Sequence, residues 1–153
     1  MGFDILGLDP EHKTGECFRN NVWYWTPIWD YIAETCKDIL STWDIEQGTC
    51  NNGYMYSMTK AMELAERLYE LLKSGKVDEW EEQYVLALQR LPDEQCSPCG
   101  GSGTRDDKYV QGECNGCKGK GTVRPFACGQ IFSKDNVQAF ADFAAVCGGF
   151  EIL

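Results

Sequence analysis

The chain has 153 residues, of which 43% are hydrophobic, 12% aromatic and 25% charged. This length allows one domain with a sizeable core and at most a small added module, and the composition excludes a disordered chain. The net charge of -10, from 14 basic and 24 acidic residues, argues against general binding to nucleic-acid backbones or anionic membranes, since both need clustered lysine and arginine. No apolar run approaches the ~18–20 residues of a membrane span, so no membrane association is expected.

Similar stretches near the two ends of the chain predict a small β-sheet. Residues 2–6 read Gly-Phe-Asp-Ile-Leu, and residues 149–153 read Gly-Phe-Glu-Ile-Leu. In an extended strand, each stretch places Phe and Ile on one face and the acidic residue on the other. We therefore predict that both are strands of one sheet; the alternative is a chance likeness.

The segment before the first predicted helix alternates like a strand. In residues 22–25, this pattern places Trp23 and Trp25 on one face. A helix is expected to follow, with Thr26 as its N-cap and Pro27 at its first helical position. Apolar residues at helical spacing extend this helix to about residue 40.

Apolar periodicity predicts three more helices. The first covers about 57–74 and stops at Gly75. The second covers about 78–91, with acidic residues in its first turn and Pro92 at its end. The third begins after Ser133 and ends before Gly148. Together with the short strands, these helices predict the α+β fold class, as a helix-rich single domain.

The uneven distribution of charge predicts an inserted module. Residues 1–95 hold 8 basic and 18 acidic side chains, residues 96–124 hold 5 and 3, and residues 125–153 hold 1 and 3. Glycine is also concentrated in the middle block. We expect residues 1–95 and 125–153 to form an acidic α+β domain, with residues 96–124 as the insert.

A repeated cysteine motif in this insert predicts a metal site. Residues 96–103 and 114–121 share the pattern C-x-x-C-x-G-x-G. Each C-x-x-C turn can direct two sulfurs at one ion, so the two pairs predict a tetrahedral zinc site, with thiol redox chemistry as the alternative. Zinc is favoured because glycine-rich turns follow both pairs, whereas a redox pair usually opens a helix. The predicted ligands are Cys96, Cys99, Cys114 and Cys117.

Sulfur at all four ligand positions leaves no coordination site open to water. One structural Zn²⁺ is therefore the expected cofactor, and it would fold a segment that is too rich in glycine to hold itself. Short strands at Tyr109–Val110 and Thr122–Val123 are expected to connect the two turns.

The nine cysteines favour a reducing, cytoplasmic location. Asp4 stands where a signal peptide would carry positive charge, so export is not expected. The cysteines outside the motif lack C-x-x-C spacing and are expected to be free thiols: Cys17, Cys36, Cys50, Cys128 and Cys147.

The repeated motif resembles the cysteine-rich domain of DnaJ-type co-chaperones over about 26 residues. That family carries four repeats and two zinc ions, so the resemblance implies one zinc ion here, ligated by the four motif cysteines. The His-Pro-Asp tripeptide of the J-domain is absent, because the only histidine, His12, is followed by Lys13. The resemblance therefore implies metal ligation and no co-chaperone function.

Residues 18–31 form an aromatic segment with three of the five tryptophans. One interpretation is a hydrophobic core, because large aromatic residues dominate small cores. The other is a binding site, since planar polar side chains lie beside stacking surfaces. The candidate ligand- or partner-binding residues are Arg19, Asn20, Asn21, Trp23, Trp25 and Asp30.

The aromatic segment also resembles a set of small uncharacterised bacterial and phage proteins. They share a Gly-Phe-Asp start, an F-R-N-N-V-W-x-W-x-P-x-W-D-Y run and a Gly-Gly-Phe-Glu-Ile end. The corresponding residues here are Gly2–Asp4, Phe18–Tyr31 and Gly148–Ile152. The resemblance implies a shared fold over most of the chain and no known activity, and its phage members favour a host protein as the partner.

No catalytic residues are predicted, because no activated nucleophile, acid–base pair or open metal site is evident. The preferred hypothesis is a non-enzymatic, zinc-stabilised binding protein that presents its metal-held loop to a protein partner. The alternative is a small-molecule binder that uses the aromatic segment. Nucleic-acid binding is least favoured because the acidic body repels phosphate. The oligomeric state is left open.

Overall fold

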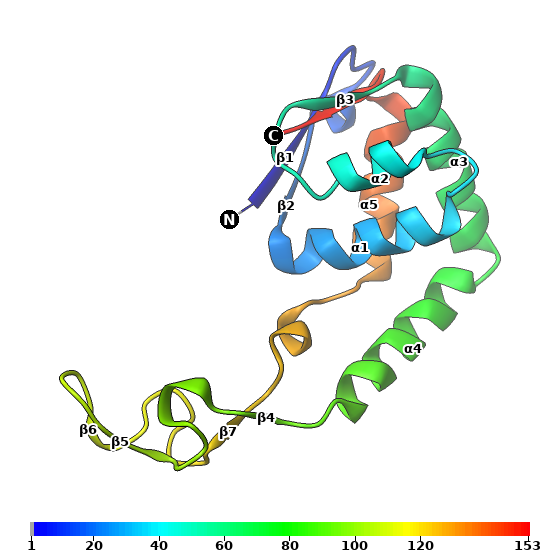
Figure 1. The fold of residues 1–153 in the computed structure, drawn as a ribbon. Coiled ribbons are helices and arrows are strands. Elements are labelled where there is room, and N and C mark those ends of the chain that lie inside the picture. Colours follow the sequence, from blue (N-terminus) through cyan, green and yellow to red (C-terminus); the bar gives the residue numbers. More distant parts are fainter. Residues whose placement is uncertain (1) are drawn as a thin grey trace. The chain divides into compact units, whose positions relative to one another are not determined.

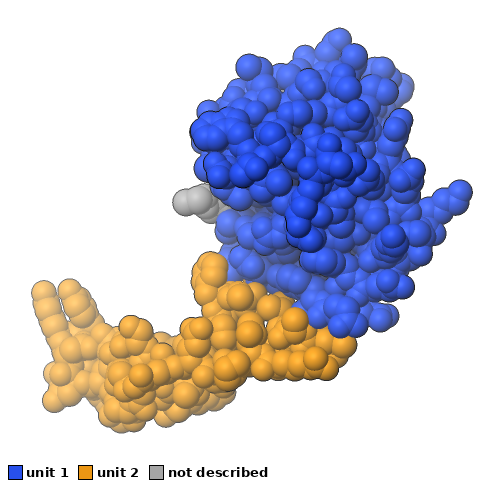
Figure 2. All heavy atoms as spheres, turned by 45° about the vertical axis from the view of Figure 1, so that its right-hand side comes forward, with its two compact units in different colours: residues 1–85, 130–153 blue, residues 86–129 orange. Residues whose placement is uncertain are grey.

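The computed structural model describes residues 2–153, which form two compact units (Figures 1 and 2). Unit 1 comprises residues 2–85 and 130–153, and unit 2 comprises residues 86–129. Helices and small antiparallel sheets make up the fold, so the predicted α+β class is confirmed. Within residues 2–153, no helix combines the length and apolar character that crossing a membrane requires.

Unit 1 contains a four-stranded antiparallel sheet. Its strands, in spatial order, are β2 (Cys17–Asn21), β1 (Gly2–Gly7), β8 (Phe150–Ile152) and β3 (Tyr54–Tyr56). Strand β1 pairs with β8 so that Ile5 lies opposite Ile152, which confirms the predicted sheet between the two end stretches. Phe3 and Phe150 are buried on the same face of the sheet as these isoleucines, as the alternation predicted.

Helices α1, α3 and α5 lie on one side of this sheet and share its hydrophobic core (Figure 1). The helices are α1 (Val22–Thr35), α2 (Thr42–Gln47), α3 (Met58–Lys73), α4 (Lys76–Arg90) and α5 (Lys134–Val146). Short 3-10 turns are η1 (Lys13–Gly15), η2 (Ser97–Cys99) and η3 (Phe126–Gly129). The helices predicted near residues 57–74, 78–91 and 134–147 are confirmed.

The strand predicted at residues 22–25 is wrong, because these residues form the first turn of α1. The side-chain oxygen of Asn21 accepts hydrogen bonds from the N–H groups of Trp23, at 3.0 Å, and Tyr24, at 3.3 Å. Asn21 is therefore the N-cap, in place of the predicted Thr26. The alternation of side chains favoured a strand, but a strong helix cap directly before it decided the local structure.

Pro27 lies inside α1 and frees a carbonyl group of the preceding turn. Proline has no N–H, so it cannot donate to the carbonyl of Trp23 four residues earlier. The N–H of Ile131 donates to that carbonyl instead, at 2.8 Å. The carbonyl group that the proline leaves free therefore links α1 to the segment that leads into α5.

Asp44 of α2 is the centre of a buried polar network. Its side chain is 1% exposed and accepts hydrogen bonds from the Ser41 N–H at 2.8 Å, the Tyr54 hydroxyl at 3.0 Å and the Lys60 ammonium group. The Tyr56 hydroxyl donates to the Asp44 backbone carbonyl at 2.6 Å. Desolvation acts to raise the pKa of Asp44, but the donors outweigh it and lower the pKa to about 2. The network joins α2 to β3 and α3.

We predict that Asp44→Asn lowers the free energy of unfolding by about 1–2 kcal/mol at neutral pH, because the neutral amide loses the ion pair with the Lys60 ammonium group. Because the folded-state pKa is lowered, this stabilisation is present above the ordinary value of 3.8 and is lost as the pH falls towards about 2. Urea unfolding of both proteins at several pH values should show their difference shrinking in acid. Asp38→Asn, at an exposed carboxylate paired with Arg67, is the control and should have a much smaller effect. A difference that does not change with pH would contradict the prediction.

Candidate metal centre

Unit 2 contains two short antiparallel strand pairs around the cysteine motif. Strand β4 (Glu94–Gln95) pairs with β7 (Thr122–Val123), and β5 (Thr104–Asp106) pairs with β6 (Gln111–Glu113). The strand predicted at Thr122–Val123 is confirmed. The strand predicted at Tyr109–Val110 is wrong, because both N–H groups donate to the Asp107 carboxylate, at 2.8 and 2.9 Å, in the turn between β5 and β6.

The two C-x-x-C-x-G-x-G repeats hold each other through reciprocal backbone hydrogen bonds. The Cys96 N–H donates to the Gly121 carbonyl, and the Cys114 N–H donates to the Gly103 carbonyl, both at 2.9 Å. The end of each repeat is therefore hydrogen-bonded to the first cysteine of the other repeat. The arrangement brings two pairs of thiols together although they are separated in the chain.

The four motif sulfurs have the spacing of a tetrahedral metal site. The Sγ atoms of Cys96 and Cys114 are 3.8 Å apart, as are those of Cys99 and Cys117, and all four lie within 4.8 Å of one another. A tetrahedral ion with metal–sulfur bonds of about 2.3 Å holds its ligands about 3.8 Å apart. A disulfide would need about 2.05 Å between sulfurs, so these thiols are free. The residues therefore fit a single metal ion.

The surroundings of the sulfurs act in opposite directions on the charge of the thiols. The Gly103 N–H donates to the Cys99 sulfur at 3.4 Å, and the Gly121 N–H donates to the Cys117 sulfur at 3.2 Å. Desolvation raises the pKa of Cys96 to about 12. Desolvation also acts to raise the pKa of Cys99, but hydrogen bonds from backbone N–H groups and neighbouring thiols lower it to about 6. A cation among the sulfurs would stabilise the thiolate form of all four.

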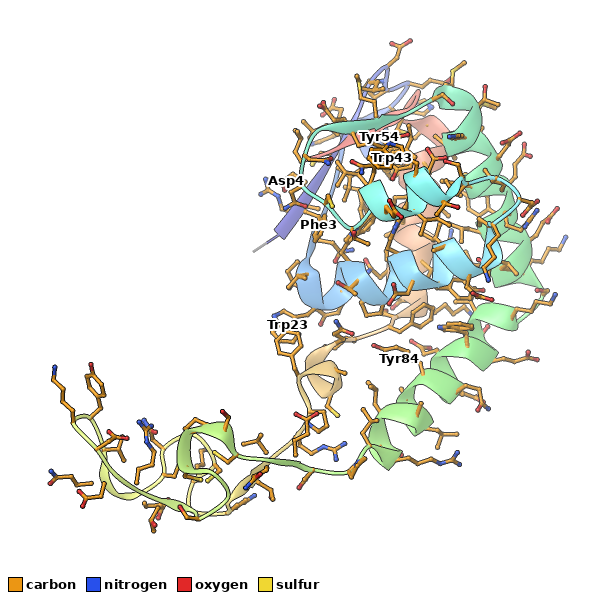
Figure 3. All side chains as sticks on the ribbon, in the orientation of Figure 1. Phe3, Asp4, Trp23, Trp43, Tyr54 and Tyr84 are labelled. Atoms are coloured by element: carbon orange, nitrogen blue, oxygen red, sulfur yellow. The ribbon has the colours of Figure 1, made fainter. Side chains whose placement is uncertain are left out.

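The candidate binding residues of the aromatic segment are divided between the core and the surface. Trp25 is 1% exposed, and its indole N–H donates to the Gly48 carbonyl at 2.8 Å. Trp23 is half-buried and projects from the first turn of α1 away from Phe3 (Figure 3). Asp30 of α1 lines a cavity of about 150 Å³ together with Trp25, and partial desolvation raises the pKa of its carboxyl group.

The other three candidates line a polar cleft of about 880 Å³ in unit 1. Arg19 is exposed and forms an ion pair with Asp4, which faces it across β1 and β2. Asn20 is 8% exposed and donates to the side-chain oxygen of Asn136 at 2.8 Å, and Asn21 caps α1. Sequence reasoning missed Asn136 of α5, which also lines this cleft, because no local pattern links it to a segment 116 residues earlier.

The comparisons with known proteins provide no relatives. No family model, curated protein or solved structure matches this chain. The candidate metal centre is therefore supported by the positions of its own cysteines, and neither a co-chaperone relationship nor a phage relationship is supported.

We predict that Gly121→Ala disrupts the metal centre far more than Gly100→Ala. Both glycines have a positive φ, of 75° and 59°, which alone costs a non-glycine residue about 1 kcal/mol. At Gly121 an added Cβ would also lie 2.4 Å from the Gly101 carbonyl oxygen, whereas at Gly100 it would meet no atom within 4 Å. Competition with a chelator and amide NMR spectra of unit 2 should show the larger loss in Gly121→Ala. Equal losses would mean that this close approach is unimportant.

Proposed function

We propose that this chain is a non-enzymatic binding protein in which one structural zinc ion folds unit 2, and that unit 2 engages a protein partner. One observation carries the structural role of the ion. The buried cluster of unit 2 consists of Cys96, Cys114 and Cys117, with Cys99 and Val123 partly buried against it. This is too little apolar burial to fold a unit of this size, so a metal–thiolate centre is the natural source of its stability.

The donor set supports zinc as the ion. Four thiolates in a tetrahedron suit zinc or a single iron. The resemblance of the repeats to the zinc-binding repeats of DnaJ-type co-chaperones favours zinc. With four protein sulfurs the coordination shell is closed, so the proposed ion has a structural role and activates no water.

An exposed aromatic residue supports a protein partner for unit 2. Tyr109 is 80% exposed in the turn between β5 and β6, and the Lys108 ammonium group lies 5.4 Å from its ring centroid. The Asp107 carboxylate holds this turn through two backbone N–H groups and an ion pair with Arg105. A tyrosine on a preorganised turn is typical of a protein-interface hot spot.

The filled core of unit 1 also favours a protein partner over a ligand among the tryptophans. Trp25 and Trp29 are each 1% exposed and stack at a centroid distance of 5.3 Å. The comparisons support neither a phage origin nor a host target, so the proposed partner is defined by chemistry. Its surface would offer an apolar depression for Tyr109, and a positive charge would speed its association with a chain of net charge -10.

A second candidate function is the binding of a polar small molecule in the cleft of unit 1. This cleft, of about 880 Å³, combines the Arg19 guanidinium with the amides of Asn20, Asn21 and Asn136. Its size lies within the ~300–1,000 Å³ of small-molecule sites. The Arg19 guanidinium is already paired with Asp4, and the Asn20 amide already donates to Asn136. Fewer polar groups therefore remain for a ligand, so we rank this function second.

We predict one zinc ion per chain in elemental analysis of the purified protein. Cys99→Ser should lose most of the bound zinc and the ordered amide signals of unit 2, while the signals of unit 1 remain. Cys128→Ser, at a cysteine of unit 2 outside the motif, is the matched control and should keep its zinc. Unchanged zinc content in Cys99→Ser would refute the assignment of the ligands.

We predict that Tyr109→Ala reduces capture of a protein from a lysate of the source organism by about tenfold or more, because a hot-spot tyrosine carries ~2 kcal/mol or more. Tyr69→Ala, on the surface of unit 1, is the control for loss of a tyrosine. Arg19→Ala tests the cleft. Capture that depends on Arg19 and not on Tyr109 would contradict a partner site on unit 2. A salt-sensitive mobility shift with DNA or RNA would instead support the nucleic-acid alternative.

A further inference from the structure

Unit 1 contains a second pocket, of about 440 Å³, that is distinct from the polar cleft. Helix α1 contributes Tyr31, α3 contributes Leu71, and α4 contributes Trp80 to its walls. The charged lining residues Lys76 and Glu79 are exposed and therefore lie at its rim. The volume falls within the ~300–1,000 Å³ that is typical of sites for small molecules.

Two side chains of this pocket carry unsatisfied polar atoms. Within residues 2–153, the Tyr31 hydroxyl and the Trp80 Nε1 are the buried side-chain nitrogen and oxygen atoms without a hydrogen-bond partner. The Tyr31 side chain is only 1% exposed. Buried polar groups are nearly always paired, since an unpaired one loses its hydration without compensation. Their occurrence together in one pocket therefore points to a ligand.

Other indole groups in the same core are satisfied. The Trp25 N–H donates to the Gly48 carbonyl at 2.8 Å, and the Trp29 N–H donates to the Ile45 carbonyl at 2.9 Å. The fold therefore provides acceptors for these two core indoles and provides none for Trp80.

The two atoms require an acceptor from the ligand. An indole N–H can only donate. Burial raises the pKa of Tyr31 to about 12, so its hydroxyl is protonated at neutral pH and can donate as well. The apolar walls disfavour a buried anion, and the opposite charges of Lys76 and Glu79 at the rim offset each other. A neutral carbonyl oxygen satisfies both donors without that penalty.

We propose that this pocket binds a small, flat, largely apolar molecule whose neutral carbonyl oxygen accepts hydrogen bonds from Tyr31 and Trp80. The rings of these residues lie 5.0 Å apart at an angle of 59°, and Trp80 is only partly buried. Neither donor atom is accessible from the pocket in this structure, so the proposed binding mode includes a tilt of the partly buried Trp80 ring away from Tyr31. This binding site is independent of the metal centre and of the partner surface on unit 2.

Acetophenone and ethylbenzene provide a matched pair of probes, because they differ in the carbonyl oxygen. Acetophenone should bind with a dissociation constant on the order of 1 mM or below and about tenfold more tightly than ethylbenzene. In ¹⁵N-labelled protein, the Trp80 indole N–H signal should move downfield with saturation, while the signals of Trp25 and Trp29 stay in place. Equal affinity for the two probes, or no saturable shift of Trp80, would overturn the proposal. Tighter binding of benzoate than of acetophenone would overturn the neutral class of ligand.

Conservative variants test whether the unpaired Tyr31 hydroxyl binds a ligand or is only an unsatisfied group in the core, because affinity and Tm should then change differently. Tyr31→Phe should weaken acetophenone about 5–10-fold and should maintain or raise the Tm, because it removes an unpaired hydroxyl. Tyr69→Phe is the control: its hydroxyl donates to Asp142 at 2.7 Å, so the variant should lower the Tm and leave the affinity unchanged. If Tyr31→Phe folds poorly, Trp80→Phe provides the same affinity test. Unchanged affinity in the folded variant would refute the site.

Discussion

The distance between four sulfur atoms is the constraint on which unit 2 depends. Its strand pairs contain two or three residues per strand, and its buried cluster is made largely of cysteines. Strands this short have little stability of their own. The sulfurs nevertheless lie within 4.8 Å of one another, at a spacing that suits one tetrahedral ion. The turn that exposes Tyr109 is held on this small framework.

Unit 1 is organised in a different way, by aromatic side chains whose polar atoms are almost all satisfied. Trp25 and Trp29 join α1 to the end of α2 through their indole N–H groups, and Asp44 joins α2 to β3 and α3. In contrast, the Tyr31 hydroxyl and the Trp80 indole N–H have no hydrogen-bond partner. Among the buried side chains of residues 2–153 these two are the exceptions, and such exceptions favour a binding site more strongly than a pocket alone does.

Local signals predicted most of the elements, and their failures have local causes. The end stretches formed one sheet because a period of two with large apolar residues suits a half-buried strand. The alternation at residues 22–25 was misleading, because the side chain of Asn21 satisfies the first N–H groups of a helix. Tyr109 and Val110 are similar: the Asp107 carboxylate accepts both of their N–H groups and turns the chain where a strand was expected.

The sequence alone identified Cys96, Cys99, Cys114 and Cys117, because covalent spacing within a C-x-x-C turn nearly determines where its sulfurs point. It also identified Trp25 as a residue of interest, but could not decide between core and site. Only the tertiary structure decided that Trp25 is buried, that Asn20 meets Asn136, and that Trp80 lacks an acceptor. Burial and hydrogen-bond partners depend on segments that are distant in the chain, and no local pattern records which of them will meet.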